Sequence, residues 1–103
     1  GLPLVAPTSM FAEVAGAVAH RTGSSQLGYH AVQSIQQVPT LQLVAVRAEL
    51  GDFAAQVAST HRLRGGDAIY VAVAYQLQVP LVSWDQEQIA RVAGFVNAYA
   101  PEQ

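Results

Sequence analysis

The stretch LRGGDAIYVAVAYQLQVPLVSWD, residues 63–85, decides the fold of this chain. Gly65 and Gly66 break the chain, and the almost wholly apolar residues 67–77 then predict a helix that is buried on most sides. Residues 79–84 are short and rich in aliphatic side chains, which indicates a buried strand. A buried helix that leads straight into a buried strand favours a parallel α/β sheet with covering helices.

Helices and strands alternate along the rest of the chain as well. Pro7, Thr8 and Ser9 are typical of a helix start, Gly23 is typical of a helix end, and Pro39 cannot continue a helix. We therefore expect an α/β fold with a parallel sheet and right-handed crossovers. The further helices are predicted at residues 7–22, 24–38, 49–63 and 85–93, and the further strands at residues 41–46 and 94–99.

The composition limits both the size and the class of the protein. A chain of 103 residues fits one small domain, so we expect residues 1–103 to form a single domain. Hydrophobic residues make up 51% and charged residues 12%, which indicates a globular chain rather than a disordered one. The absence of cysteine excludes disulfides and thiolate metal sites, and it fits the reducing environment of the cytoplasm.

Charge and hydropathy argue against two further classes of protein. The formal net charge is −2 and no basic stripe is present, which argues against binding of nucleic acid by charge alone. Any contact with nucleic acid must then be local, or depend on metal ions or a second subunit. The longest apolar run, residues 68–75, is far shorter than the ~20 residues that span a bilayer, so we expect no membrane partner.

Asp67 and Asp85 are predicted to meet at one edge of the sheet. The helix that begins at Asp67 runs ~16 Å outward, and the strand that follows covers a similar distance back. At this edge of an open α/β sheet ligands bind, and helix N-termini there favour anions. The alternative is that each residue caps a helix, and Asp85 with Gln88 resembles a capping box. Both roles are compatible, because a carboxylate has two oxygens.

Glu13 adds a third carboxylate to this set. It is the only charged residue between positions 10 and 19, where most neighbours are apolar. A carboxylate on so apolar a helix loses hydration unless a cation or hydrogen-bond donors meet it. Three carboxylates favour a hard, oxygen-preferring cation such as Mg²⁺ or Mn²⁺. The alternative is that Glu13 faces solvent on a narrow exposed side of its helix.

Residues 63–85 resemble the C-terminal half of a PIN domain, and in particular the toxins of the VapC type. The matching motifs are Asp67-Ala68, which opens a helix of small residues, and Ser83-Trp84-Asp85, which ends an aliphatic strand. Residues 6–23 are similar to the helix of that family that carries an acidic residue, here Glu13, and residues 95–101 are similar to its last strand. The resemblance covers nearly the whole chain and implies a three-layer αβα arrangement around a parallel sheet.

The resemblance implies a metal-dependent endoribonuclease, the toxin of a type II toxin–antitoxin pair. Glu13, Asp67 and Asp85 would then hold one or two Mg²⁺ or Mn²⁺ ions, directly or through water, and a metal-activated water would attack the RNA phosphodiester. The implied partners are an RNA substrate and an antitoxin protein, and we expect a homodimer. The implied location is the cytoplasm.

One part of the family pattern has no counterpart in this sequence. The family begins with a central strand that ends in a further Asp and a helix, before the segment that corresponds to Ala6, whereas the first acidic residue here is Glu13. The chain is then a fragment, or a partner supplies the strand, or the domain is degenerate; we expect N-terminal truncation. The rival hypothesis is an inactive PIN-like module for protein interaction or dimerisation, because a missing central strand leaves strand edges and apolar faces uncovered.

Three polar side chains near the carboxylates have open roles. Ser83 supports the site or a water, or its hydroxyl only satisfies the end of the strand. Arg62 and Arg64 reach an RNA phosphate from the rim of the site, or they are solvated arginines at a helix end; the second interpretation is the simpler. Apolar neighbours favour core packing over base stacking for the aromatic side chains Tyr70, Tyr75 and Trp84.

Overall fold

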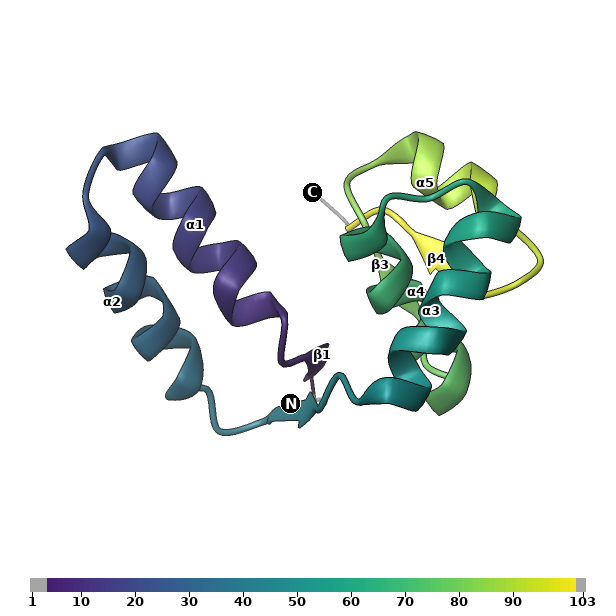
Figure 1. Ribbon diagram of the computed structural model, residues 1–103, viewed down its shortest axis with the longest axis horizontal. Helices are drawn as coiled ribbons and strands as arrows, with labels where there is room; N and C mark the ends of the chain where they lie inside the picture. The colour runs from purple at the N-terminus through teal and green to yellow at the C-terminus, as the bar shows by residue number, and fades with distance from the viewer. Residues whose placement is uncertain (1–3, 102–103) are drawn as a thin grey trace. The chain divides into compact units, whose positions relative to one another are not determined.

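The computed structural model of the protein describes residues 4–101, which belong to two compact units (Figure 1). The first unit is Gly1–Ala45 and the second is Val46–Gln103. Each unit combines helices with one short, two-stranded parallel sheet, β1–β2 in the first and β3–β4 in the second. The predicted α/β class with parallel strand pairing is therefore confirmed. The three-layer PIN arrangement and the single domain over residues 1–103 stay predictions.

The first unit is a helical hairpin between two short strands. Its elements are β1 (Leu4–Pro7), α1 (Met10–Thr22), α2 (Ser25–Gln36) and β2 (Leu41–Val44). Gly23 ends α1 with a φ of 72°, a left-handed conformation that glycine adopts without strain. Ser24 begins α2, since its Oγ accepts a hydrogen bond of 3.1 Å from the N–H of Leu27. Both helix boundaries agree with the sequence prediction.

A close approach fixes the packing of α1 against α2, which lie side by side in Figure 1. Gly28 is buried in α2, and a Cβ at this position would lie 2.6 Å from the carbonyl oxygen of Ala15 in α1. Only glycine therefore lets the two backbones come this close.

Strand β1 was not predicted. Residues 7–9 suggest a helix start, yet Pro7 is the last residue of β1 and α1 begins only at Met10. β1 pairs in parallel with β2, with Leu4 opposite Leu41 and Ala6 opposite Leu43. The N–H of Thr8 continues the pairing with a bond of 2.9 Å to the carbonyl oxygen of Val44. Proline donates no N–H, but it is tolerated at the end of an edge strand, and within residues 4–101 β1 pairs with β2 alone.

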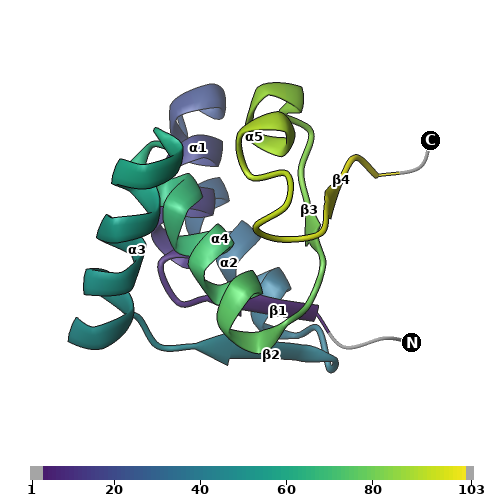
Figure 2. The same ribbon diagram turned by 90° about the vertical axis from the view of Figure 1, so that its right-hand side faces the viewer.

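The second unit holds most of the fully buried side chains. Its elements are α3 (Ala48–His61), α4 (Gly65–Leu77), β3 (Leu81–Val82), α5 (Gln86–Arg91) and β4 (Ala98–Tyr99). α3 and α4 pack against each other (Figure 2). Four consecutive residues of α4, 71–74, are buried, as the apolar sequence predicts. β3 and β4 pair in parallel, with Leu81 opposite Ala98.

Both strands of the second unit are shorter than predicted. The predicted strand 79–84 contracts to Leu81–Val82, preceded by Pro80, which has no N–H for a ladder. The predicted strand 94–99 begins only at Ala98. A turn takes its place, in which the N–H of Phe95 donates to the carbonyl oxygen of Val92 at 3.0 Å and Gly94 has a φ of 84°.

Several large apolar side chains are exposed in the part of the chain that the structure describes. No residue of α1 is fully buried. Trp84 is 70% exposed, so core packing of this ring is wrong as a prediction. Tyr75 is 46% exposed, but its ring stacks on Phe95 and lies against Phe53, as its apolar neighbours predict. Trp84 is exposed because it follows the short strand β3, where the paired backbone ends. No helix within residues 4–101 is both long and apolar enough to cross a membrane.

Candidate functional site

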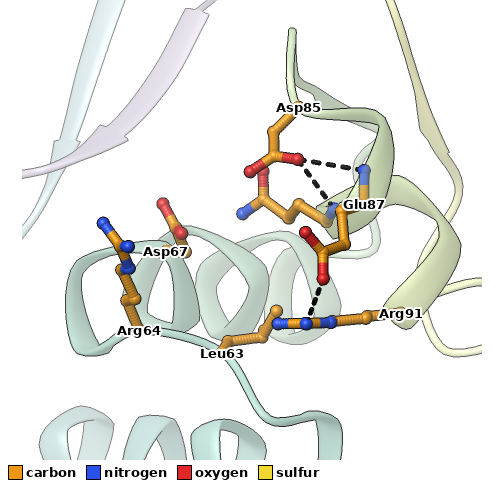
Figure 3. Close-up of a pocket in the computed structure, with 7 residues that line it drawn as sticks. Leu63, Arg64, Asp67, Asp85, Glu87 and Arg91 are labelled. Atoms are coloured by element: carbon orange, nitrogen blue, oxygen red, sulfur yellow. Dashed lines mark hydrogen bonds and ion pairs between the residues drawn. The ribbon is translucent and has the colours of Figure 1, made fainter.

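A pocket of about 300 Å³ in the second unit contains both aspartates (Figure 3). Asp67 reaches it from the first turn of α4 and Asp85 from the residue before α5. The structure therefore brings Asp67 and Asp85 to one pocket, and their role as metal ligands stays a prediction. The residues that line the pocket are Leu63, Arg64, Asp67, Asp85, Glu87, Gln88 and Arg91.

Asp67 is not the N-cap of its helix. α4 begins at Gly65, two residues earlier than predicted, and its N-cap is Arg64, whose side chain makes no capping hydrogen bond. Asp67 is half-buried in the first turn, where the unpaired N–H groups of a helix carry partial positive charge. The capping role that the sequence left open for Asp67 is therefore wrong, and its side chain lines the pocket instead.

Asp85 is the N-cap of α5, which is the alternative that its sequence position left open. Its Oδ1 accepts hydrogen bonds from the N–H of Glu87 at 2.9 Å and from the N–H of Gln88 at 3.2 Å. These two bonds satisfy two of the orphan donors at the helix start. No other hydrogen bond reaches this carboxylate from residues 4–101, so Oδ2 remains for a ligand in the pocket.

Ser83 and Gln88 support Asp85 from behind. The Oγ of Ser83 accepts a bond of 3.0 Å from the N–H of Asp85 and donates a bond of 2.5 Å to Oε1 of Gln88. Gln88 is only 8% exposed. In a capping box the Gln88 side chain would accept directly from the N–H of Asp85. Here Ser83 lies between them, so its hydroxyl satisfies the end of the strand, and its role in supporting a site stays a prediction.

Gln88 was missed as a residue of the site. The spacing of Asp85 and Gln88 pointed only to a capping box, in which the glutamine has a local role. In the structure Gln88 is buried, lines the pocket beside Asp85 and accepts a hydrogen bond from Ser83. A serine two residues before the aspartate was the signal that could have indicated it.

Arg91 links the far end of α5 to the loop before α4. Its Nη1 donates a bond of 2.7 Å to the carbonyl oxygen of Arg62, and its Nη2 pairs with the carboxylate of Glu87. The Nδ1 of His61 donates a bond of 3.1 Å to the carbonyl oxygen of Arg91, since a carbonyl can only accept. Arg62 therefore contributes its backbone to the structure of the pocket, whereas Arg64 lines the pocket.

The pocket combines both signs of charge. Three carboxylates (Asp67, Asp85 and Glu87) and two arginines (Arg64 and Arg91) line it, which gives a formal charge of 2 − 3 = −1. Glu87 and Arg91 form an ion pair and largely cancel each other. The charges that remain unpaired within the pocket lining are those of Asp67, Asp85 and Arg64. Two carboxylates suit a metal cation, and a guanidinium beside them suits an anion bound to that cation.

Glu13 belongs to the first unit. It lies in the first turn of α1 and is exposed, which matches the solvent-facing alternative that its sequence position left open. Its role as a metal ligand stays a prediction.

The donor set of the pocket fits Mg²⁺ or Mn²⁺. Within residues 4–101 no group of three or more His, Asp or Glu residues is arranged to hold a metal. Mg²⁺, however, is commonly bound through only one or two carboxylates, with waters and substrate phosphates as the other ligands. Asp67 and Asp85 supply these two carboxylates from one pocket.

No family model and no curated protein matches the chain. The resemblance to PIN domains therefore stays a prediction that rests on the motifs around Glu13, Asp67 and Asp85.

Proposed function

We propose that the protein is a metal-dependent endoribonuclease of the PIN type, the toxin of a toxin–antitoxin pair. The observation that carries the proposal is the pocket in which Asp67 and Asp85 lie together with Arg64. A bound cation and an RNA phosphate need these two kinds of group, carboxylate and guanidinium, at one place. The PIN-like three-layer fold, the cytoplasmic location, the homodimer and an antitoxin as inhibitor belong to the same proposal.

Each group of the pocket has a role in this proposal. Asp67 and Oδ2 of Asp85 hold Mg²⁺ or Mn²⁺. The bound ion supplies Lewis-acid stabilisation of the phosphate and activation of a water nucleophile. Arg64 at the rim binds a phosphate oxygen of the RNA. Glu87 and Arg91 fix the wall of the pocket, since their charges are already paired.

A nuclease assay with the full-length gene product tests the proposal. We expect cleavage of single-stranded RNA in Mn²⁺ or Mg²⁺, its loss in EDTA, and a decrease of at least about a hundredfold in Asp67→Asn. Asp52→Asn is the matched control, because Asp52 is an exposed carboxylate of α3 that accepts a hydrogen bond from Gln56 and does not line the pocket. Equal cleavage by Asp67→Asn and Asp52→Asn would contradict the proposal.

The second candidate is an interaction module without catalysis. The exposed apolar side chains favour it, since Leu27 and Tyr29 of α2 are 50% and 60% exposed and no residue of α1 is fully buried. Such surfaces are typical of sites that another protein covers. Calorimetry separates the two functions: absence of Mn²⁺ binding by the full-length protein, together with a stable dimer or complex, would favour the interaction module.

A further inference from the structure

The two oxygens of the Asp85 carboxylate have different environments. Oδ1 accepts two backbone N–H bonds, from Glu87 and Gln88, and a carboxylate oxygen accepts about two such bonds. Oδ2 receives no hydrogen bond from residues 4–101. The carboxylate can present Oδ2 to a ligand in the pocket only as long as Oδ1 stays on the two N–H groups.

A directed chain of hydrogen bonds holds the backbone of Asp85 in the same place. The N–H of Asp85 can only donate, so Ser83 Oγ must accept from it at 3.0 Å. The single hydroxyl proton of Ser83 is then donated to Gln88 Oε1 at 2.5 Å. The N–H of Gln88 in turn bonds to Asp85 Oδ1, which closes a ring of three residues. The side chain of Gln88 is therefore the acceptor on which the whole ring depends.

We infer that Gln88 is a positioning residue for Asp85, acting through Ser83. This inference rests on the proposed function only in so far as Asp85 binds a metal. Gln88 is 8% exposed, so few waters can replace it as the acceptor for Ser83. Without that acceptor the Ser83 hydroxyl turns away, the N–H of Asp85 loses its partner and the carboxylate becomes free to rotate. Partners of this kind behind metal ligands typically affect metal affinity by roughly ten- to a hundredfold.

Two measurements on Gln88→Met test the inference. Methionine keeps the length of the side chain and removes the acceptor oxygen. Without metal, we expect the Asp85 backbone N–H to exchange with solvent roughly two- to tenfold faster, as measured by NMR. With Mn²⁺, titration calorimetry should show affinity weakened by roughly ten- to a hundredfold. Gln88→Glu keeps an acceptor oxygen for Ser83 and should restore the slow exchange of the Asp85 N–H; only exchange is compared for this variant, because its added charge in the pocket strengthens Mn²⁺ binding directly.

Gln86→Met is the matched control, because Gln86 is exposed in the same helix and does not line the pocket. It should leave both measurements unchanged. If Gln88→Met fails to fold, Ser83→Ala takes its place, since it breaks the same chain of bonds and should give the same two changes. Unchanged exchange of the Asp85 N–H and unchanged Mn²⁺ affinity in the folded variant would overturn the inference.

Failure of the inference differs from failure of the proposed function. If the wild type binds Mn²⁺ and Gln88→Met binds it equally tightly, the metal site stands and the role of Gln88 is overturned. A wild-type protein that binds no Mn²⁺ overturns the proposed function, and the role of Gln88 at a metal site with it.

Discussion

Arg91 Nη1 donates a hydrogen bond of 2.7 Å to the carbonyl oxygen of Arg62, across 29 residues of sequence. Arg91 lies at the end of α5, which begins beside Asp85, and Arg62 lies in the link that leads to Asp67 in α4. The bond therefore joins the two segments that carry the aspartates. The hydrogen bonds around Asp85 are local, so this bond and the bond from His61 Nδ1 to the carbonyl oxygen of Arg91 join the end of α5 to the chain before α4.

Arg91→Lys should separate this link from the ion pair with Glu87. Lysine still pairs with Glu87 four residues earlier, but it lacks the planar fork that reaches the Arg62 carbonyl as well. We expect the free energy of unfolding to fall by about 1 kcal/mol and RNA cleavage to fall roughly tenfold. Denaturant unfolding and the nuclease assay measure the two effects.

Glu87→Gln is the control for this variant. It removes only the exposed ion pair, which contributes about 0–1 kcal/mol, and it leaves the bond to Arg62 in place. An equal loss of stability in Arg91→Lys and Glu87→Gln would show that the bond to the carbonyl does not brace the pocket.

Arg62→Gly should give opposite signs in two measurements. Arg62 has a φ of 58°, a left-handed conformation that costs an ordinary residue roughly 1 kcal/mol and costs glycine almost nothing. Stability should therefore rise by up to about 1 kcal/mol. RNA cleavage should fall, as expected from the interpretation in which the Arg62 guanidinium reaches an RNA phosphate from the rim of the site. Gln78→Gly, with a φ of 53°, is the matched control: it should stabilise to a similar degree and leave cleavage unchanged.

The helices of this protein follow from its sequence better than the strands do. Helix ends are fixed by local chemistry, such as Gly23 in its left-handed conformation and the capping hydroxyl of Ser24, and both were predicted. Strands depend on partners that are distant in sequence. β1 escaped prediction because its four residues end in Pro7, and residues 94–97 carry a strand-like composition although Gly94 turns the chain.

The candidate site could be predicted only in its backbone geometry. The rise per residue of a helix and of a strand is fixed, so Asp67 and Asp85 could be expected in one place from their spacing alone. The bond from Ser83 to Gln88 depends on which rotamers the packed unit selects. The bond from Arg91 to Arg62 depends on how α5 packs on the link before α4. The packing of α5 has no signature in sequence spacing, whereas the serine two residues before Asp85 is a signal for the first bond.

Gly28→Ala should destabilise the first unit. The added Cβ would lie 2.6 Å from the Ala15 carbonyl oxygen, which belongs to the backbone of α1 and can move only with the helix. We expect a loss of roughly 1–3 kcal/mol in denaturant unfolding. Gly16→Ala is the matched control within α1, since nothing lies within 4 Å of its added Cβ, and it should stabilise by about 0.5–1 kcal/mol. A Gly28→Ala variant as stable as Gly16→Ala would contradict the close packing of α1 on α2.

Two substitutions at Asp85 should separate helix capping from metal binding. Asn is as good an N-cap as Asp, and its side-chain oxygen can still accept from the N–H groups of Glu87 and Gln88. Without metal, Asp85→Asn should therefore keep the free energy of unfolding to within about 0.5 kcal/mol, whereas Asp85→Ala should lose about 0.5–2 kcal/mol.

Mn²⁺ should then reveal the second role of Asp85. At a concentration of about 100 times its dissociation constant, the ion should stabilise the wild type by about 2.7 kcal/mol. Both Asp85 variants should lose most of this gain, because neither has the charged carboxylate that lines the pocket in the wild type. Thermal unfolding with and without Mn²⁺ measures all three proteins under the same conditions. If Asp85→Asn kept the full stabilisation by Mn²⁺, Asp85 would be a helix cap and no metal ligand.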